Sequence, residues 1–232
     1  MADIATTIRS PILGLSLLEI AALLEIEVPH RTDNNYYRSE EFRAHCKRVK
    51  GSIDTDSYYE RPQYLLNDHF YPRFSPVLER RISRDLHKIR NAPFANQLHD
   101  DIDWITERQA DIVKYLCGTQ ERYLTSGNPL DLQNMTSADI RRHIDYDQST
   151  ANRLLQGLTI RLPNHEVIFA KNLVPGNGLM GIKIRYALDQ LKGDIDYYES
   201  EWKNTSQELA AVISQKFGLE VSERTVRKYW KD

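Results

Sequence analysis

The stretch TSQELAAVISQKFGLEVSERTVRKYW, residues 205–230, decides the fold expected for the C-terminal part of the chain. Thr205 and Glu208 have the spacing of a capping box, in which two side chains bond the free amides of a helix's first turn. Apolar residues then recur at helical spacing up to a glycine, a common helix stop: Leu209, Val212, Ile213, Phe217 and Gly218. Ser222 can cap a second helix over 223–230, so this stretch predicts a helix-turn-helix.

The second of these helices concentrates positive charge. Val226 and Trp230 fall on one side of it and would face the protein. Arginine can donate two hydrogen bonds to guanine and lysine can bind phosphate, so the outward residues are candidates for DNA contacts. They are Arg224, Arg227, Lys228 and Lys231. The competing interpretation is a charged face that is only solvated, because most helical pairs do not touch DNA.

An earlier segment has the same pattern. Thr136 opens a helix that continues through Ile144, residues 145–147 form a turn, and a second helix covers 148–156. Its polar face carries four side chains that suit base edges and phosphates in the major groove. These are Gln148, Ser149, Asn152 and Arg153. A recognition helix is therefore predicted twice, with ordinary structural packing as the alternative for each.

Helical patterns also dominate the remaining sequence, so the expected fold class is mainly α. Apolar residues recur at helical spacing in three further segments, the last long enough for one helix or a pair: residues 12–28, 76–90 and 95–124. Residues 30–71 have weak periodicity, and short helices and loops are expected there. Strand signals are confined to residues 165–170 and 181–186, enough for one small β hairpin or wing.

The composition fits a globular protein of one or two domains. Of 232 residues, 41% are hydrophobic and 28% charged, with a net charge of -2, which excludes a chain that acts as one large polycation. Cys46 and Cys117 lack CxxC neighbours, so neither a disulfide framework nor a zinc site is expected. Glu19 and Glu25 interrupt the apolar segment 12–28, which argues against a membrane span or an export signal. A cytoplasmic protein without membrane contact is therefore expected.

The sequence ERTVRKY, residues 223–229, resembles the signature box ARRTVAKYRE near the C-terminus of the bacterial sigma-54 family. Five residues match in register: Arg224, Thr225, Val226, Lys228 and Tyr229. The helix that begins at Ser206 and stops at Gly218 stands where the family's last domain has the first helix of its recognition motif.

Upstream segments resemble the same family in order and spacing. Residues 148–153, QSTANR, are similar to the family's HESTVSR recognition helix, and residues 162–164 and 167–169 are similar to the stretch that follows it. Eight further residues look like the core-binding region that leads into that motif: Glu107, Arg108, Ile112, Val113, Gln120, Gly127, Pro129 and Leu130. The resemblance covers about residues 96–232.

This resemblance implies a transcription initiation factor that is not an enzyme and needs no cofactor. It would bind core RNA polymerase and double-stranded promoter DNA, with the C-terminal helix at the upstream element and residues 148–153 at the downstream element. Thr225 and Tyr229 join the DNA-binding candidates through the matched box.

The implied architecture is a helical bundle core-binding region plus two helix-turn-helix units. Residues 1–92 would be an N-terminal helical region of unknown role. Residues 93–175 would hold the core-binding helices and the first helix-turn-helix, and residues 176–232 a linker and the C-terminal helix-turn-helix.

The chain departs from the family pattern at its N-terminal part and within the box. Family members begin with a Gln- and Leu-rich region that engages an ATP-driven activator, whereas the first glutamine here is Gln63. Whether the chain has an activator ATPase as a partner therefore stays open. Glu223 replaces the first arginine of the box and would repel a phosphate, while Arg227 and Lys231 replace an alanine and a glutamate and add positive charge.

Other functions stay open. A DNA-binding regulator or decoy from a phage or mobile element would keep both motifs without recruiting polymerase, and a protein-interaction module would use the same helices to bind another protein. Enzyme chemistry is weakly indicated. His99, Asp100 and Asp101 suit a metal phosphohydrolase but lack further ligands at a suitable spacing. The tyrosine pairs lack the partners of a recombinase, and the glycines of 176–181 follow no strand and resemble a linker turn.

Overall fold

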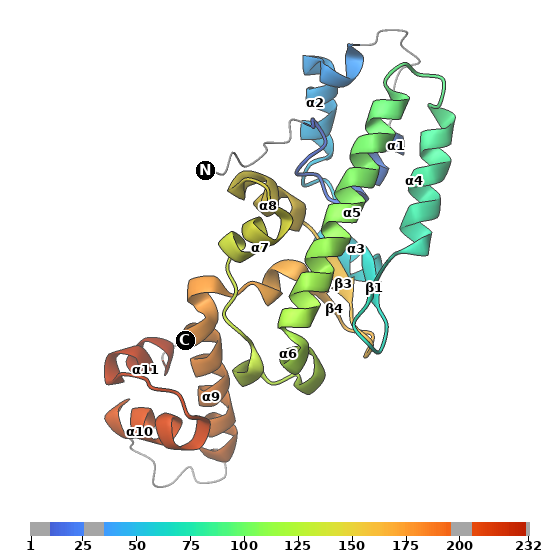
Figure 1. The fold of residues 1–232 in the computed structure, drawn as a ribbon. Helices are drawn as coiled ribbons and strands as arrows, with labels where there is room; N and C mark the ends of the chain where they lie inside the picture. The colour runs from blue at the N-terminus through green and yellow to red at the C-terminus, as the bar shows by residue number, and fades with distance from the viewer. Residues whose placement is uncertain (1–9, 26–34, 196–205, 231–232) are drawn as a thin grey trace. The chain divides into compact units, whose positions relative to one another are not determined.

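The computed structural model describes residues 10–25, 35–195 and 206–230 (Figure 1). The fold is mainly helical, as predicted, with one small β sheet. The chain forms two compact units whose sequences interleave. The units are residues up to 119 with 135–174, and residues 120–134 with those from 175 onward.

The N-terminal part of the first unit is helical. Its helices are α1 (Leu17–Glu25), η1 (Tyr36–Arg38), α2 (Glu40–Val49), α3 (Thr55–Glu60), α4 (Pro76–Lys88) and α5 (Ala95–Thr119). α1 packs against α2 and α4 and buries most of its side chains, which confirms an apolar helix within the predicted segment 12–28, although the described residues before Leu17 are not helical. Its acid Glu19 is buried too, because the carboxylate accepts hydrogen bonds from the backbone amides of Ser16 and Gly51. A buried charge is tolerated where such bonds replace water.

A four-stranded sheet joins segments that are far apart in the sequence. Its strands are β1 (Tyr64–Leu66), β2 (Pro72–Phe74), β3 (Thr159–Arg161) and β4 (Val167–Phe169), in the order β2-β1-β3-β4. The central strands β1 and β3 run parallel to each other. β1 also pairs with β2, and β3 with β4, each in an antiparallel hairpin. The strand predicted over 165–170 is confirmed, but its hairpin belongs to this larger sheet.

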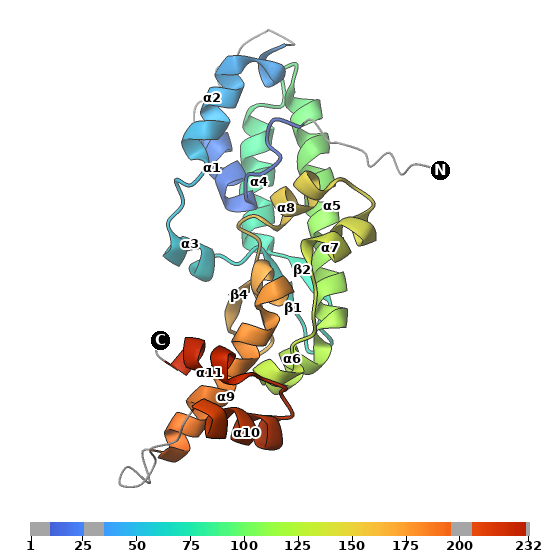
Figure 2. The same ribbon diagram turned by 90° about the vertical axis from the view of Figure 1, so that its left-hand side faces the viewer.

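Two short helices of the first unit pack on α5 (Figure 2). They are α7 (Ser137–Ile144) and α8 (Gln148–Leu155), which lie where the sequence predicted them. α7 begins with a capping box in which Thr136 and Asp139 bond each other's amides. Asp145 ends α7 with a φ of +56°, and the chain turns directly into α8. The β3–β4 hairpin and the 3-10 helix η3 (Ala170–Leu173) follow.

The second unit is also built from helices. They are α6 (Glu121–Ser126), η2 (Pro129–Asp131), η4 (Gly176–Gly178), α9 (Leu179–Ile195), α10 (Ser206–Phe217) and α11 (Glu223–Trp230). The last three share one apolar core, in which the buried residues are Ile184, Ala187, Leu188, Leu191, Leu209, Ala210, Ile213 and Val226. The apolar side of the helix predicted over 223–230 therefore packs against α9 and α10 through Val226.

α9 corrects two predictions. Residues 181–186, predicted as a strand, and the glycines of 176–181, predicted as a linker turn, form part of η4 and α9. The alternation of Ile182, Ile184 and Tyr186 suggested a strand, but Ile184 and Leu188 also lie one helical turn apart and are both buried. The helical conformation buries Ile184 and Leu188 against α10 and α11, and these tertiary contacts override the local β preference.

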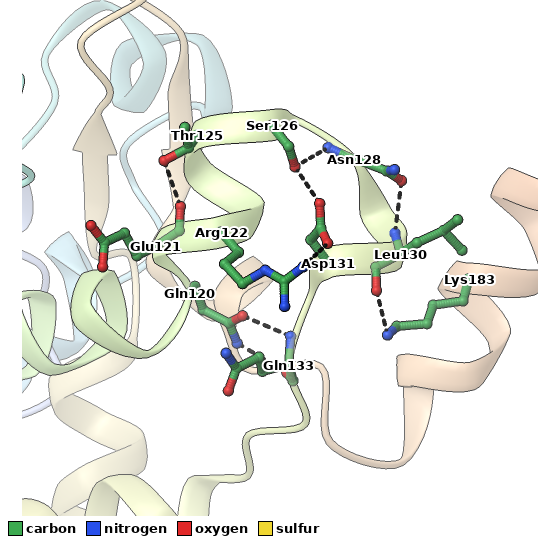
Figure 3. Close-up of polar contacts among 10 residues, drawn as sticks. All are labelled: Gln120, Glu121, Arg122, Thr125, Ser126, Asn128, Leu130, Asp131, Gln133 and Lys183. Carbon is green, nitrogen blue, oxygen red and sulfur yellow. Dashed lines mark hydrogen bonds and ion pairs between the residues drawn. The ribbon is translucent and has the colours of Figure 1, made fainter. Parts of the chain in front are cut away.

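Side-chain hydrogen bonds close the segment 120–134 (Figure 3). Gln120 is buried, and its amide pairs with the backbone of Gln133 in both directions, at 3.0 Å from Nε2 to the carbonyl oxygen and 2.8 Å from the backbone nitrogen to Oε1. The Nζ of Lys183 in α9 donates to the carbonyl oxygen of Leu130 at 2.6 Å. These bonds fasten the segment within the second unit.

The two cysteines are buried free thiols. Burial raises the pKa of Cys46 to about 11 and that of Cys117 to about 12. Little thiolate is then present at neutral pH, so neither side chain is a ready nucleophile. Among the described helices, none has the length and apolar character that crossing a membrane requires.

Candidate nucleic-acid interface

The polar face predicted on α8 is exposed. Its members, Gln148, Ser149, Asn152 and Arg153, are all accessible to solvent. The opposite side of α8 is buried through Thr150, Ala151, Leu154 and Leu155. Gln148 and Asn152 lie one turn apart, and the side-chain amide of Gln148 donates to Oδ1 of Asn152 at 3.2 Å. The structure thus brings the predicted α8 residues onto one surface.

Buried amides from other elements hold the end of α8. Gln109 of α5 is fully buried, and its Nε2 donates to the carbonyl oxygen of Leu154 at 2.9 Å. The side-chain amide of Gln63 donates to the carbonyl oxygen of Gly157. Gly157 has a φ of +63°, and a Cβ there would lie only 2.8 Å from the Cβ of Ser16. Because the last carbonyls of a helix lack partners within it, these contacts fix where α8 ends.

Asp147 is the N-cap of α8. Its carboxylate accepts hydrogen bonds from the Thr150 hydroxyl at 2.6 Å and from the backbone amides of Ser149 and Thr150 at 2.8 and 3.1 Å. These bonds, that of the Thr150 hydroxyl first, lower the pKa of Asp147 to about 2. The pKa of an unfolded aspartate is higher, near 3.9, so the ionised cap stabilises the native state above about pH 4. That contribution is lost as the pH falls towards 2.

Asp147→Ala is expected to lower the free energy of unfolding by about 0.5 to 2 kcal/mol at pH 7, the usual range for a lost N-cap. The difference from wild type should shrink between pH 5 and pH 2.5, because the stabilisation from the ionised Asp147 carboxylate is lost as the pH falls through that range. Urea unfolding at several pH values measures both effects. Asp100→Ala is the matched control, since Asp100 is exposed on α5 and should change neither value. A difference that stays constant with pH would contradict the assignment.

A hollow of about 760 Å³ lies beside α8 in the first unit. Asn152 and Gln156 of α8 line it together with Phe169 of β4 and with Lys171 and Asn172 of η3. Lys171 and Asn172 are exposed donors that could meet a phosphate. They were missed in the sequence because they belong to neither helix pair. The signal in the sequence was the position of this cation and this amide directly after the strand predicted over 165–170.

α11 presents the cationic face in the second unit. Ser222 caps the helix as predicted, since its Oγ accepts a hydrogen bond from the backbone nitrogen of Thr225 at 3.3 Å. Val226 is fully buried in the core shared with α9 and α10. Three predicted cations are exposed: Arg224, Arg227 and Lys228. Lys231 and Thr205 lie outside the described residues, so the capping box predicted for α10 is not described.

Ion pairing distinguishes the cations of α11. Arg227 forms an ion pair with Glu223, one turn before it. Glu223, predicted to repel a phosphate, is therefore neutralised by its neighbour. Within the described part of the chain, Arg224 and Lys228 form no ion pair. Among the described cations of α11, these two are left to meet an anion.

Thr225 and Tyr229 are half-buried, which separates them from the exposed candidates. The Thr225 hydroxyl lies 2.8 Å from that of Ser222 and so takes part in the cap of α11. The Tyr229 ring packs on α9, with the guanidinium carbon of Arg185 at 5.3 Å from the ring centroid. A Cβ on Gly181 would lie 2.7 Å from the Tyr229 hydroxyl oxygen, so the ring fits closely against that glycine. Both side chains hold α11 in place.

The residues considered for enzyme chemistry are dispersed. His99 contacts Asp103 at 3.2 Å on the surface of α5, and another histidine, His143 of α7, stacks its ring on that of Tyr115 with 4.1 Å between centroids. In the described ranges, no group of three or more His, Cys, Asp or Glu side chains could hold a metal ion.

Comparison with known proteins assigns the chain to no family. No protein-family model matches the sequence, and none of the curated proteins matches it. Function is therefore inferred from the chemistry of the two exposed faces and from the sequence resemblance of their motifs.

Proposed function

We propose that the chain is a sigma-54-like transcription initiation factor that binds double-stranded promoter DNA and core RNA polymerase. The observation that carries this proposal is the exposed cationic face of α11, which coincides with the matched signature box. On that face Arg224 and Lys228 stand without an ion pair among the described residues, while Val226 anchors the opposite side. A charged side held outward by a buried apolar side is what a groove-binding helix requires.

In this proposal the residues of α11 have separate roles. Arg224 contacts a base, because a guanidinium offers two parallel donors to guanine. Lys228 lies one turn later and contacts a phosphate as a point charge. Thr225 and Tyr229 position the helix through its cap and its packing on α9.

α8 is the second reading element. The amides of Gln148 and Asn152 can pair with adenine, and Arg153 can bond guanine or phosphate. The β3–β4 hairpin follows α8 directly, and Lys171 comes soon after its second strand, where a wing would meet the neighbouring backbone. Two different reading helices in one chain would bind an asymmetric site without dimerisation.

The polymerase contact rests on the resemblance of residues 107–130 to the family's core-binding region. These residues span the C-terminal half of α5, α6 and the start of η2. The proposal includes no enzyme activity, because the chain would act by recruiting an enzyme to DNA. An activator ATPase is part of the proposal only through the resemblance.

Co-purification with core RNA polymerase tests the proposal. The full chain, with and without the polymerase, is also used to select duplexes from a random pool, and the selected duplexes are sequenced. We expect the polymerase to retain the chain, and the selected duplexes to contain paired GG and GC elements at a fixed separation.

The remaining outcomes separate the alternatives. Selection of a DNA sequence without retention by polymerase would replace the proposal with a regulator or decoy. Retention by a protein partner without any salt-dependent DNA binding would replace it with a protein-interaction module, because phosphate contacts make DNA affinity fall steeply with salt.

A further inference from the structure

A cationic stripe lies on α2 in the first unit. Arg43, Lys47 and Lys50 follow one another at spacings of four and three residues, so they share one side of α2 and its C-cap. All three side chains are exposed. No motif marks this stripe in the sequence, and neither helix pair includes it.

The stripe borders a hollow of about 420 Å³, which Arg153 of α8 also lines. None of the lining residues is an Asp or Glu. Arg43 pairs with Glu40 at 2.6 Å. In contrast, Lys47, Lys50 and Arg153 form no ion pair within the described ranges. Three positive charges that have no ion pair among the described residues therefore line one hollow.

Gly14 connects this hollow to the face of α8. It has a φ of +99°, and a Cβ there would lie 3.4 Å from Cγ of Arg153. The stem of Arg153 thus packs directly on the glycine backbone. Arg153 belongs both to the exposed face of α8, with Asn152, and to the lining of the hollow, with Lys47. The cations of α2 consequently continue the surface proposed to read DNA.

We infer that Lys47, Lys50 and Arg153 bind backbone phosphates of the duplex whose bases α8 reads. This inference rests on the proposed function. The two lysines can reach successive phosphates, since α2 rises about 4.5 Å from residue 47 to residue 50, slightly more than one base step along a strand. Flexible lysines suit such a row, because they bind phosphate as point charges. Contacts of this kind fix the register of a reading helix without themselves reading sequence.

Salt titration of DNA binding tests the inference. Full-length Lys47→Gln and Lys47→Gln/Lys50→Gln variants are titrated with a mixed-sequence duplex between 50 and 200 mM salt. Each lost phosphate contact should reduce the slope of log K against log salt by about 0.9. For the double variant, the rise in Kd over this range should be about 12-fold smaller than for wild type.

Arg48→Gln is the matched control. Arg48 is exposed on the same helix and carries the same charge, but it does not line the hollow. Its slope should stay near the wild-type value. A similar loss in Arg48→Gln would overturn the inference by showing an effect of net charge alone, and so would a wild-type slope in both lysine variants.

A second measurement does not depend on affinity. A DNA-cleaving reagent attached to a Lys47→Cys variant should cut the duplex beside the site protected by α8, and the buried Cys46 and Cys117 should not compete for the reagent. Absence of cutting by a variant that still binds DNA would overturn this inference but not the proposed function. A wild-type chain that binds no duplex at any salt concentration would overturn the proposed function as well.

Discussion

Arg224→Ala is expected to weaken binding to the preferred duplex by about 1 to 3 kcal/mol, which is roughly 5- to 150-fold in Kd. The reason is that Arg224 is exposed on α11 and has no ion pair among the described residues, so its donors are available to a base. Fluorescence anisotropy with the selected duplex and with a scrambled duplex measures the change. Discrimination between the two should fall together with affinity.

Arg224→Lys is the matched control because it keeps the charge and removes the planar pair of donors. It should lose discrimination while keeping the salt dependence of wild type. Lys228→Ala should do the reverse, weakening binding to both duplexes and reducing the salt slope. Wild-type affinity of Arg224→Ala for both duplexes would remove α11 from the reading surface.

Ile213→Ala is expected to lower the free energy of unfolding of the second unit by about 2 to 5 kcal/mol. Ile213 of α10 is fully buried in the core that carries α11, so its loss leaves a cavity beneath the cationic helix. Because this core is small, few other contacts can compensate. Binding to the upstream element should decrease in parallel, although Ile213 touches no DNA.

Hydrogen exchange of the full chain measures that loss unit by unit. Amides of α9, α10 and α11 should exchange faster in Ile213→Ala, while those of α1, α4 and α5 in the first unit should keep wild-type rates. Gln215→Ala, at an exposed position of the same helix, should change neither set. Faster exchange throughout both units would show that their stabilities are coupled, contrary to this expectation.

Elements with strong local signals could be predicted from the sequence. Ser222 caps α11 and Gly218 ends α10 with a φ of +65°, and both positions were recognisable because a cap or a left-handed turn depends on one residue and its near neighbours. The same reason accounts for α7 and α8. The exposed face of α8 followed from helical spacing alone, since the buried residues Ala151 and Leu154 define its opposite side.

Features that depend on distant partners could not be predicted. β1 is only three residues long, and besides its hairpin partner β2 it pairs in parallel with β3, about a hundred residues later. Gln63 and Gln109 hold the end of α8 from two other elements, and no local pattern identifies such contacts. The hollow lined by Lys47 and Arg153 likewise joins α2 to α8. Pairing and burial of this kind arise only once the chain has folded.

The bond from Lys183 to Leu130 has a consequence for dissecting the protein. The chain passes between the units after residues 119, 134 and 174, and the middle excursion is fastened to α9 through Lys183 and Leu130. A single proteolytic cut at residue 174 would therefore leave residues 120–134 on the N-terminal fragment, although they belong to the second unit, and would separate them from α9. Isolating either unit intact requires cutting at every crossing or grafting the excursion back onto the C-terminal piece.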